Sequence, residues 1–282
     1  MSQVKTRIIS DIHYGDRVSA VGNFAQLSPL LEDTDTLILN GDTIDTRPGP
    51  NPGYNHQLQE DLQEFTQSSS TEIKLLTGNH DPDISPLHFT ELAQGSVVVT
   101  HGDILFSNIV PWGRDAALAR ELVEQALGII KPSEDELTRL LQAHRQAAAK
   151  IPQYHQSERN GLRYYTSFLT DTIWPPTRFF HILNSWRKFP LLGQALLSAH
   201  RAKARFLVSG HTHWPGVWSR SDGRVCINTG SYCPPCGRLM VELTDDQLVV
   251  RRILIIRRDF HPGQIIAQFA LTQSADSNKQ VS

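Results

Sequence analysis

The sequence predicts a layered α/β fold, and three observations support that prediction. Short runs rich in isoleucine, leucine and valine recur along the chain, as is typical of buried strands. The early runs alternate with segments of helical character, which indicates sheets covered by helices. Polar residues follow directly after five of the runs, so the strand ends are also the candidate functional positions.

Five apolar runs are predicted as the first strands, over residues 4–10, 36–40, 72–77, 96–100 and 205–209. Residues 23–31 and 57–67 are predicted as helices between the early strands. Three later segments also have strand character, over residues 225–228, 238–243 and 247–256. The last two are expected to form a hairpin that turns at residues 244–246.

Residues 110–205 are predicted as a helical insertion that caps the sheets. Helices are expected over residues 116–130, over 171–182 with an interruption at Pro175 and Pro176, and over 191–204. Ser133 and Glu136 have the spacing of a capping box, which would open another helix that ends near Lys150. No flexible linker brackets the insertion, so residues 1–272 are expected to form one domain. Residues 273–282 are polar and are predicted as a disordered tail.

Side chains that bind metals follow the five predicted strand ends. The motifs are Asp11-Ile12-His13, Gly41-Asp42, Gly78-Asn79-His80-Asp81, His101-Gly102-Asp103 and Gly210-His211-Thr212-His213. One Gly-Asp pair after a strand is usually only a turn, but five such motifs in order require a common explanation. Carboxylates, imidazoles and an amide oxygen suit manganese, iron or zinc. The pattern therefore predicts a two-metal site, a device that hydrolyses phosphate esters.

The order of these motifs resembles that of the calcineurin-like metallophosphoesterase superfamily. The resemblance spans residues 11–213 and implies a four-layer α/β/β/α sandwich with a helical cap. It also implies two divalent metal ions, manganese first and iron or zinc as alternatives, and a metal-bridging hydroxide that attacks a phosphate ester or pyrophosphate. By this resemblance one metal binds to Asp11, His13 and His213, a second binds to Asn79, His101 and His211, and Asp42 bridges them.

The same resemblance assigns roles next to the metals. His80 is expected to protonate the leaving-group oxygen or to contact the phosphate, and Asp81 is expected to orient His80. Asp45 and Asp103 are expected to support the ligands or cap loops. Residues 228–231 resemble the closing Asn-x-Gly-Ser segment of the superfamily and are predicted to form a tight turn under the site.

Within the superfamily, the layout is similar to that of UDP-2,3-diacylglucosamine diphosphatases, in which a helical lid covers an acylated nucleotide. Those enzymes commonly have arginine at the position of His80, whereas this chain keeps the imidazole of the broader phosphatases and phosphodiesterases. The substrate is therefore expected to be a phosphorylated small molecule or a nucleotide, with a lipid-linked nucleotide as the alternative.

The net charge of −2 conceals an uneven distribution along the chain. Residues 1–103 contain 15 acidic and 5 basic side chains, and the remaining 179 residues contain 14 acidic and 22 basic side chains. Residues 178–205 combine aromatic and basic residues without Asp or Glu, and four of the basic residues are candidates for substrate binding, namely Arg178, Arg187, Lys188 and Arg201. This stretch fits a membrane-surface face, a cap for a phosphate-rich substrate or an ordinary helix surface.

Composition excludes several other classes of protein. No run approaches the roughly 20 apolar residues of a membrane span, so a cytoplasmic enzyme is expected, with peripheral membrane contact as an alternative. A nuclease is disfavoured because the isoelectric point of about 6.6 gives no extended basic surface. A non-catalytic scaffold is disfavoured because no ligand is missing. Cys233 and Cys236 have the spacing of half a zinc site, but the second half is missing, so they are interpreted as loop cysteines.

Overall fold

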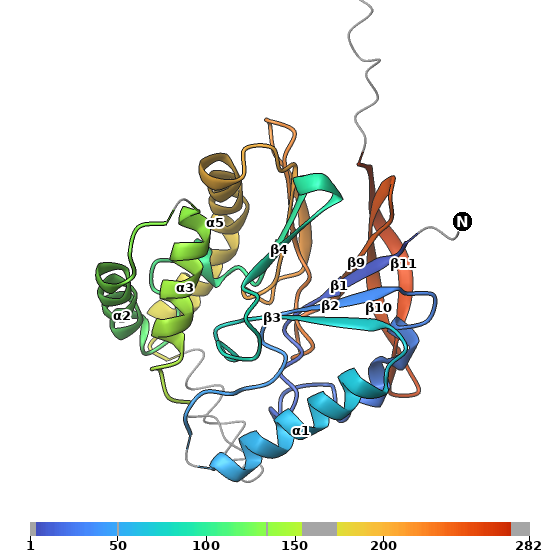
Figure 1. The fold of residues 1–282 in the computed structure, drawn as a ribbon, viewed down its shortest axis with the longest axis horizontal. Coiled ribbons are helices and arrows are strands. Elements are labelled where there is room, and N and C mark those ends of the chain that lie inside the picture. The colour runs from blue at the N-terminus through green and yellow to red at the C-terminus, as the bar shows by residue number, and fades with distance from the viewer. Residues whose placement is uncertain (1–3, 50, 134, 154–173, 272–282) are drawn as a thin grey trace, which may run out of the picture.

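The computed structural model describes residues 4–49, 51–133, 135–153 and 174–271. Two sheets form the centre of the molecule, and helices lie on their outer sides (Figure 1). The first sheet has six strands in the order β11-β10-β9-β1-β2-β3. Their bounds are β1 Thr6–Ile9, β2 Thr36–Asn40, β3 Glu72–Leu76, β9 Leu239–Leu243, β10 Gln247–Ile256 and β11 Asp259–Ala270.

The second sheet has five strands in the order β4-β5-β6-β8-β7. Their bounds are β4 Phe89–Leu92, β5 Val97–Thr100, β6 Phe206–Ser209, β7 Gly216–Ser219 and β8 Val225–Asn228. Each sheet contains three neighbouring parallel strands, β1, β2 and β3 in the first and β5, β6 and β8 in the second. Antiparallel strands extend both sheets. The carboxyl ends of the parallel strands consequently lie along one edge of each sheet.

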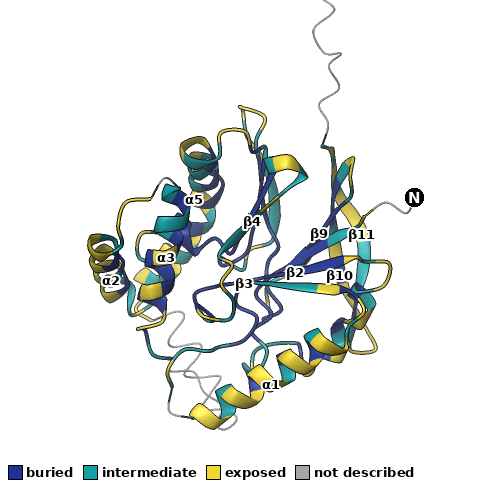
Figure 2. Cartoon of the chain, viewed as in Figure 1, coloured by how far each residue is buried: buried dark blue, intermediate teal, exposed yellow. Residues whose placement is uncertain are grey.

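Among the described residues, hydrophobic clusters on both faces of each sheet separate four layers, because successive side chains of a strand point to opposite faces. Leu37 and Leu39 of β2 face outward onto helix α1 (Pro52–Ser68) and the 3-10 helix η1 (Phe24–Leu30). Ile38, between them in sequence, faces the second sheet and packs in the core between the sheets. On the second sheet, Leu207 packs against helix α5 (Thr177–His200). The predicted α/β/β/α sandwich is therefore confirmed, with α1 exposed on its outer face (Figure 2).

The described part of the insertion consists mainly of helices α2 (Ala116–Ile129), α3 (Glu136–Ala148) and α5. Residues 171–182 and 191–204 were expected to contain separate helices, but α5 is one helix that continues through the buried residue Pro190. The predicted capping box is also wrong, because the Ser133 hydroxyl accepts from the Asp135 backbone N–H at 3.2 Å and Asp135 is the N-cap. Residues 154–173, which include the start of the predicted helix over 171–182, lie outside the described residues.

The other predicted strands agree with the structure to within two residues, and β9 and β10 form the expected hairpin. Three strands were missed: β4, β7 and β11. β11 contains Pro262 and Gly263, a pair that normally indicates a turn. Register shifts in the β10–β11 pairing around Arg251 accommodate this pair within a long hairpin.

The predicted tail, residues 273–282, lies outside the described residues, and the domain boundary at residue 272 stays a prediction. Among the helices that the structure describes, none is both long and apolar enough to cross a membrane.

Candidate metal centre

The five motifs meet where the carboxyl ends of the two sheets come together. Each motif begins within two residues of the end of β1, β2, β3, β5 or β6. In α/β sheets this edge is the usual place for ligands. The first sheet contributes the loops that hold Asp11, Asp42 and Asn79, and the second contributes those of His101 and His211. The site thus depends on both sheets.

The loop backbones are unusually constrained. Five of the seven predicted ligands have left-handed backbone conformations, with φ between 49° and 69°; they are Asp11, His13, Asp42, His211 and His213. Non-glycine residues rarely adopt this conformation, and such residues cluster at functional sites. Gly210 must be glycine for a different reason, because a Cβ there would lie 1.9 Å from the Asp11 carboxylate. The left-handed conformations at these five residues are locally unfavourable, and they bring the side chains together.

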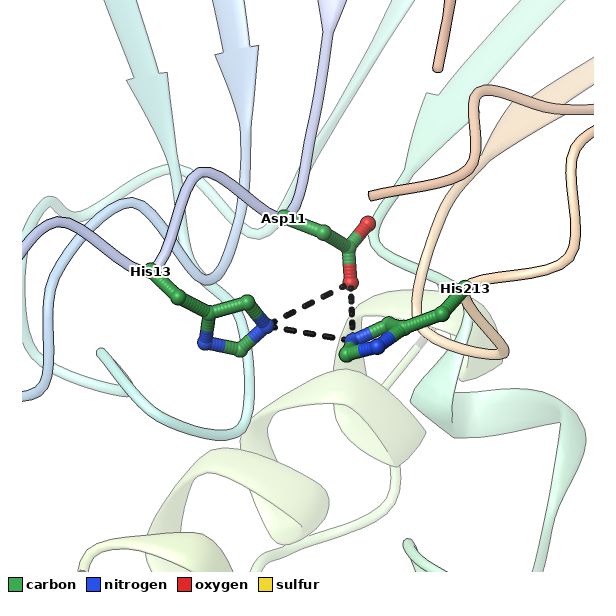
Figure 3. Close-up of side chains that lie close together, drawn as sticks. All are labelled: Asp11, His13 and His213. Atoms are coloured by element: carbon green, nitrogen blue, oxygen red, sulfur yellow. Dashed lines mark hydrogen bonds and ion pairs between the residues drawn. The ribbon is translucent and has the colours of Figure 1, made fainter. Parts of the chain in front are cut away.

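Asp11, His13 and His213 converge on one point (Figure 3). The distance from His213 Nε2 to Asp11 Oδ1 is 3.2 Å, and His13 Nε2 lies 3.1 Å from His213 Nε2 and 3.9 Å from Asp11 Oδ1. Both Asp11 oxygens also accept the His211 backbone N–H at 3.0 Å. These three residues are called the first set.

The second set consists of Asn79, His101 and His211. His101 Nε2 lies 3.2 Å from Asn79 Oδ1, and His101 and His211 form a possible metal-holding group with Asp42. Asp42 Oδ2 lies 3.2 Å from His101 Nε2 and 3.8 Å from His13 Nε2. One carboxylate oxygen therefore faces both sets, as a bridging ligand must.

The electrostatics of the site favour a bound positive charge. Burial lowers the pKa of His13 and His211 to about 4, so both rings are neutral at pH 7, the form that ligates metals. Burial also acts to lower the pKa of His101, but Asp42 and Asp11 outweigh it and raise that pKa to about 10. Asp11 is fully buried and Asp42 is 2% exposed, and ionised carboxylates this deep require a partner of opposite charge. The donor set and its charge therefore fit divalent cations.

A comparison with known protein families shows the family of this chain. The family described as calcineurin-like phosphoesterase matches residues 4–215, which is most of the chain. The chain belongs to the calcineurin-like phosphoesterase family. The resemblance inferred from the motifs is thereby confirmed, and a search of curated proteins finds no match.

Solved structures also match the chain, at low identity. A predicted phosphoesterase from Streptococcus pneumoniae is 17% identical, with 96% of this chain and 99% of that chain covered and a TM-score of 0.38. A dimetal phosphatase from Danio rerio is 16% identical, with 96% and 99% covered and a TM-score of 0.45. Vacuolar protein sorting 29 from Cryptosporidium parvum is 14% identical, with 95% and 98% covered and a TM-score of 0.42.

As a calcineurin-like phosphoesterase the chain places His80 beside the two sets. His80 Nε2 lies 4.0 Å from Asp42 Oδ2, and His80 Nδ1 lies 3.1 Å from Asp45 Oδ2. Arg47 Nη2 lies 2.8 Å from the same ring nitrogen and 2.7 Å from Asp45 Oδ2. Burial and Arg47 act to lower the pKa of His80, but Asp42 and Asp45 outweigh them and raise it.

The role expected for Asp81 requires a correction. Its carboxylate accepts three backbone N–H groups, those of Asp42 at 2.9 Å, Thr43 at 2.6 Å and Gly78 at 2.7 Å. Asp81 therefore holds the loops of Asp42 and Asn79 together, and among the described residues Asp45 is the carboxylate within hydrogen-bonding distance of the His80 ring. Sequence reasoning had placed Asp45 near the site but missed Arg47, which follows it by two residues.

Residues 228–231 run from the end of β8 into a bridge with Arg238, and the Asn228 side chain accepts the Gly230 backbone N–H at 2.9 Å, so the expected tight turn takes the form of an Asx turn. Gly230 has a φ of 78°, and the Tyr232 backbone N–H donates to the Asp11 carbonyl at 3.1 Å. The Asn228 amide donates to the Thr212 hydroxyl at 3.0 Å, which fixes the loop between His211 and His213. Cys226 and Cys233 are buried free thiols, and Cys236 is a half-buried one.

The four basic candidates for substrate binding lie on α5 or at its end. Arg187 and Lys188 are exposed and Arg178 is half-buried. Arg201 is bound to Glu91 at 2.6 Å and to Asp135 at 2.8 Å, so its guanidinium already has two carboxylate partners and the expectation that it holds a phosphate is corrected. A pocket next to the first set is lined by other residues, including His13, Tyr54, Asn55, His80 and Gln153.

Proposed function

We propose that this protein hydrolyses a phosphate ester or a pyrophosphate with two divalent cations. Asp11, His13 and His213 would hold one cation, Asn79, His101 and His211 the other, and Asp42 would be shared. The position of Asp42 Oδ2 between His13 and His101 is the observation that carries the proposal. A cation pair supplies an activated water and offsets the charge on the phosphate oxygens. Manganese is the first candidate, with iron and zinc as alternatives.

His80 is proposed as the group that protonates the leaving oxygen. In its protonated form the ring donates its Nδ1–H to Asp45, and its Nε2–H is then directed toward the side of Asp42. Arg47 binds Asp45 and so keeps that carboxylate in place. The polar pocket beside His80 is the proposed site for the leaving group.

The substitution Asp42→Asn tests the proposal directly. The variant should bind less Mn²⁺, because Asp42 is the proposed shared ligand of both cations. Its rate of manganese-stimulated hydrolysis of p-nitrophenyl phosphate should fall by at least about 100-fold, because the cations activate the attacking water. Metal content measured by elemental analysis and the rate are compared with those of Asp245→Asn, which changes an exposed aspartate on the β9–β10 turn. Wild-type protein without metal-dependent activity, together with unchanged metal content in Asp42→Asn, would refute the proposal. The same assay separates it from a non-catalytic scaffold.

We propose that the substrate is a phosphate compound that is linked to a lipid or lies at a membrane surface. The surface of α5 supports this class of substrate. The helix has no Asp or Glu over its 24 residues. Its outward side presents Phe180, Leu183 and Leu191, which are 67%, 40% and 52% exposed, next to the exposed residues Arg187 and Lys188. Aromatic, aliphatic and basic side chains on one helix side are typical of binding to anionic lipid surfaces. A nuclease would need a larger basic surface.

A further inference from the structure

The two histidines of the second set each have one ring nitrogen within hydrogen-bonding distance of a backbone carbonyl. His101 Nδ1 lies 3.1 Å from the Asn40 carbonyl, and His211 Nε2 lies 2.8 Å from the Ile109 carbonyl. Histidine ligands commonly donate their second N–H in this way, which fixes the tautomer and the ring orientation. His101 thus presents Nε2 and His211 presents Nδ1 as the ligating nitrogen. Asn40 belongs to the sheet, whereas Ile109 lies at the entry to the insertion.

Ile109 is an unusual residue for this task. It has a φ of 59°, a conformation that is a rare outlier for a β-branched residue. Its side chain is 1% exposed and packs with Ala119 and Val123 of α2 and with Ala147 and Ala148 of α3. Strained backbone of this kind persists only where the surrounding packing enforces it. The packing of α2 against α3 therefore holds Ile109 in the conformation that places its carbonyl oxygen 2.8 Å from His211 Nε2.

Helix α3 makes a second connection, to the segment that follows His101. Arg145 Nη2 donates to the Asp103 carboxylate, and the two side chains are 4% and 0% exposed. Leu137 and Leu141 of α3 pack on Ile104, the next residue. A buried ion pair of this kind is costly to break, because the remaining charge is left without a partner. The helix therefore fixes the start of the loop that carries His101.

From these two connections we infer that the α2–α3 pair positions the second set of metal ligands. It acts through the Ile109 carbonyl on His211 and through Arg145 and Asp103 on the His101 loop. Among the described residues, no hydrogen bond from α2 or α3 reaches Asp11, His13 or His213. The insertion is thus part of the metal centre and not only a cover for substrate. The inference rests on the proposed function, since it requires a cation at the second set.

Val123→Ala tests this inference without touching a ligand. Val123 is 4% exposed and packs around Ile109, so its truncation should loosen the carbonyl that holds His211. We expect one of the two Mn²⁺ binding steps, measured by titration calorimetry, to weaken by about threefold or more, and the other to stay unchanged. The weakened step should be the one that is lost in His211→Ala. The matched control is Val250→Ala, a buried valine in the core between the sheets, which should leave both steps unchanged at a similar cost in stability.

Arg145→Met provides a second variant and should weaken the same step by about tenfold. If it does not fold, as judged by circular dichroism, Val123→Ala decides alone. Wild-type protein that binds two Mn²⁺ ions, together with variants that keep both steps, would overturn the inference. It would equally be overturned if Val123→Ala and Val250→Ala weakened binding alike, since that is the result of a general loss of stability. Wild-type protein that binds no metal would instead count against the proposed function.

Discussion

His80 is held on both sides by charged residues, and this arrangement determines when it can donate a proton. Asp45 Oδ2 and Arg47 Nη2 both lie within hydrogen-bonding distance of His80 Nδ1, while Nε2 faces Asp42, and the two carboxylates act to raise the pKa of His80. A raised pKa favours the protonated ring, which is the form that a general acid requires. Burial and Arg47 oppose this effect, so the pKa depends on burial and on the charges of Arg47, Asp42 and Asp45.

We expect His80→Gln to slow hydrolysis according to the leaving group. Phenyl phosphate, whose leaving oxygen needs a proton, should lose about 100-fold or more in kcat, whereas 2,4-dinitrophenyl phosphate should lose little. In wild-type protein the rate with phenyl phosphate should fall as the pH rises through the pKa of His80, because only the protonated ring donates. Asp45→Asn should lower that pKa and shift the fall to lower pH. Equal losses with both substrates would show that His80 contacts the phosphate without donating a proton.

At the residue scale, the sequence was sufficient to predict which side chains meet. All seven predicted ligands follow strand ends, and the geometry of parallel strands brings such positions to one edge. The contacts of Asp45, Arg47 and Asp81 were not predictable in the same way. They join loops more than 30 residues apart in sequence, and the direction of each side chain depends on the left-handed backbone at the ligands.

At the scale of elements, predictions succeeded where the apolar pattern is strong and failed at the edges. β2 and β10 have the predicted bounds because they are nearly continuous apolar runs. β4 and β7 lie at the two edges of the second sheet and are only partly buried, so they show little apolar pattern. α5 continues through Pro190 because its tertiary packing outweighs the local cost of the proline.

The Arg201 bridge ties three elements together and should contribute to stability in a pH-dependent manner. It joins the end of α5 to Glu91 of β4 and to Asp135 at the start of α3. The hydrogen bond from Arg201 lowers the pKa of Asp135 to about 2 from its ordinary value of 3.8. Because the folded pKa is below the unfolded one, this contribution is present above pH 3.8 and is lost as the pH falls through about 2.

Asp135→Asn should therefore destabilise the fold at pH 7 and at pH 5 by up to about 1 kcal/mol, the range for partly exposed ion pairs. The difference from wild type should shrink at pH 3. Urea unfolding at the three pH values measures the free energy of unfolding, with Asp245→Asn as the control that should match wild type throughout. A difference that is constant with pH would mean that Asp135 acts through its cap position and not through its charge.

At the scale of the whole molecule, the sequence predicted the layers but not the role of the insertion. The family resemblance implied the four layers, and the apolar runs of the strands agree with it because they are buried on both faces. The connection of α2 and α3 to the second set depends on one backbone carbonyl and one buried ion pair. Neither has a sequence pattern, so only the three-dimensional arrangement reveals that the cap and the metal centre are joined.

The uneven charge along the chain has a consequence for how the molecule would meet a membrane. The acidic N-terminal part holds four of the five motifs, whereas the basic stretch lies on α5. A protein with this division should present α5 to an anionic bilayer, since each basic residue near the surface contributes about 1 kcal/mol. The exposed side chains of Phe180 and Leu191 would then enter the headgroup region.

Sedimentation with vesicles of phosphatidylglycerol and phosphatidylcholine tests this arrangement at low salt. Wild-type protein should bind, and Arg187→Glu/Lys188→Glu should lower the partition coefficient by about tenfold or more, because two attractive charges become repulsive. The control is Arg257→Glu/Arg258→Glu, which makes the same change of charge at the exposed β10–β11 turn and should retain most of the binding. Equal losses of binding in the two variants would show that only the net charge of the protein matters. If the wild-type protein did not bind, α5 would be an ordinary solvated helix. Either outcome would remove the lipid surface as the partner of α5 while leaving the metal centre unaffected, because neither pair contributes a ligand.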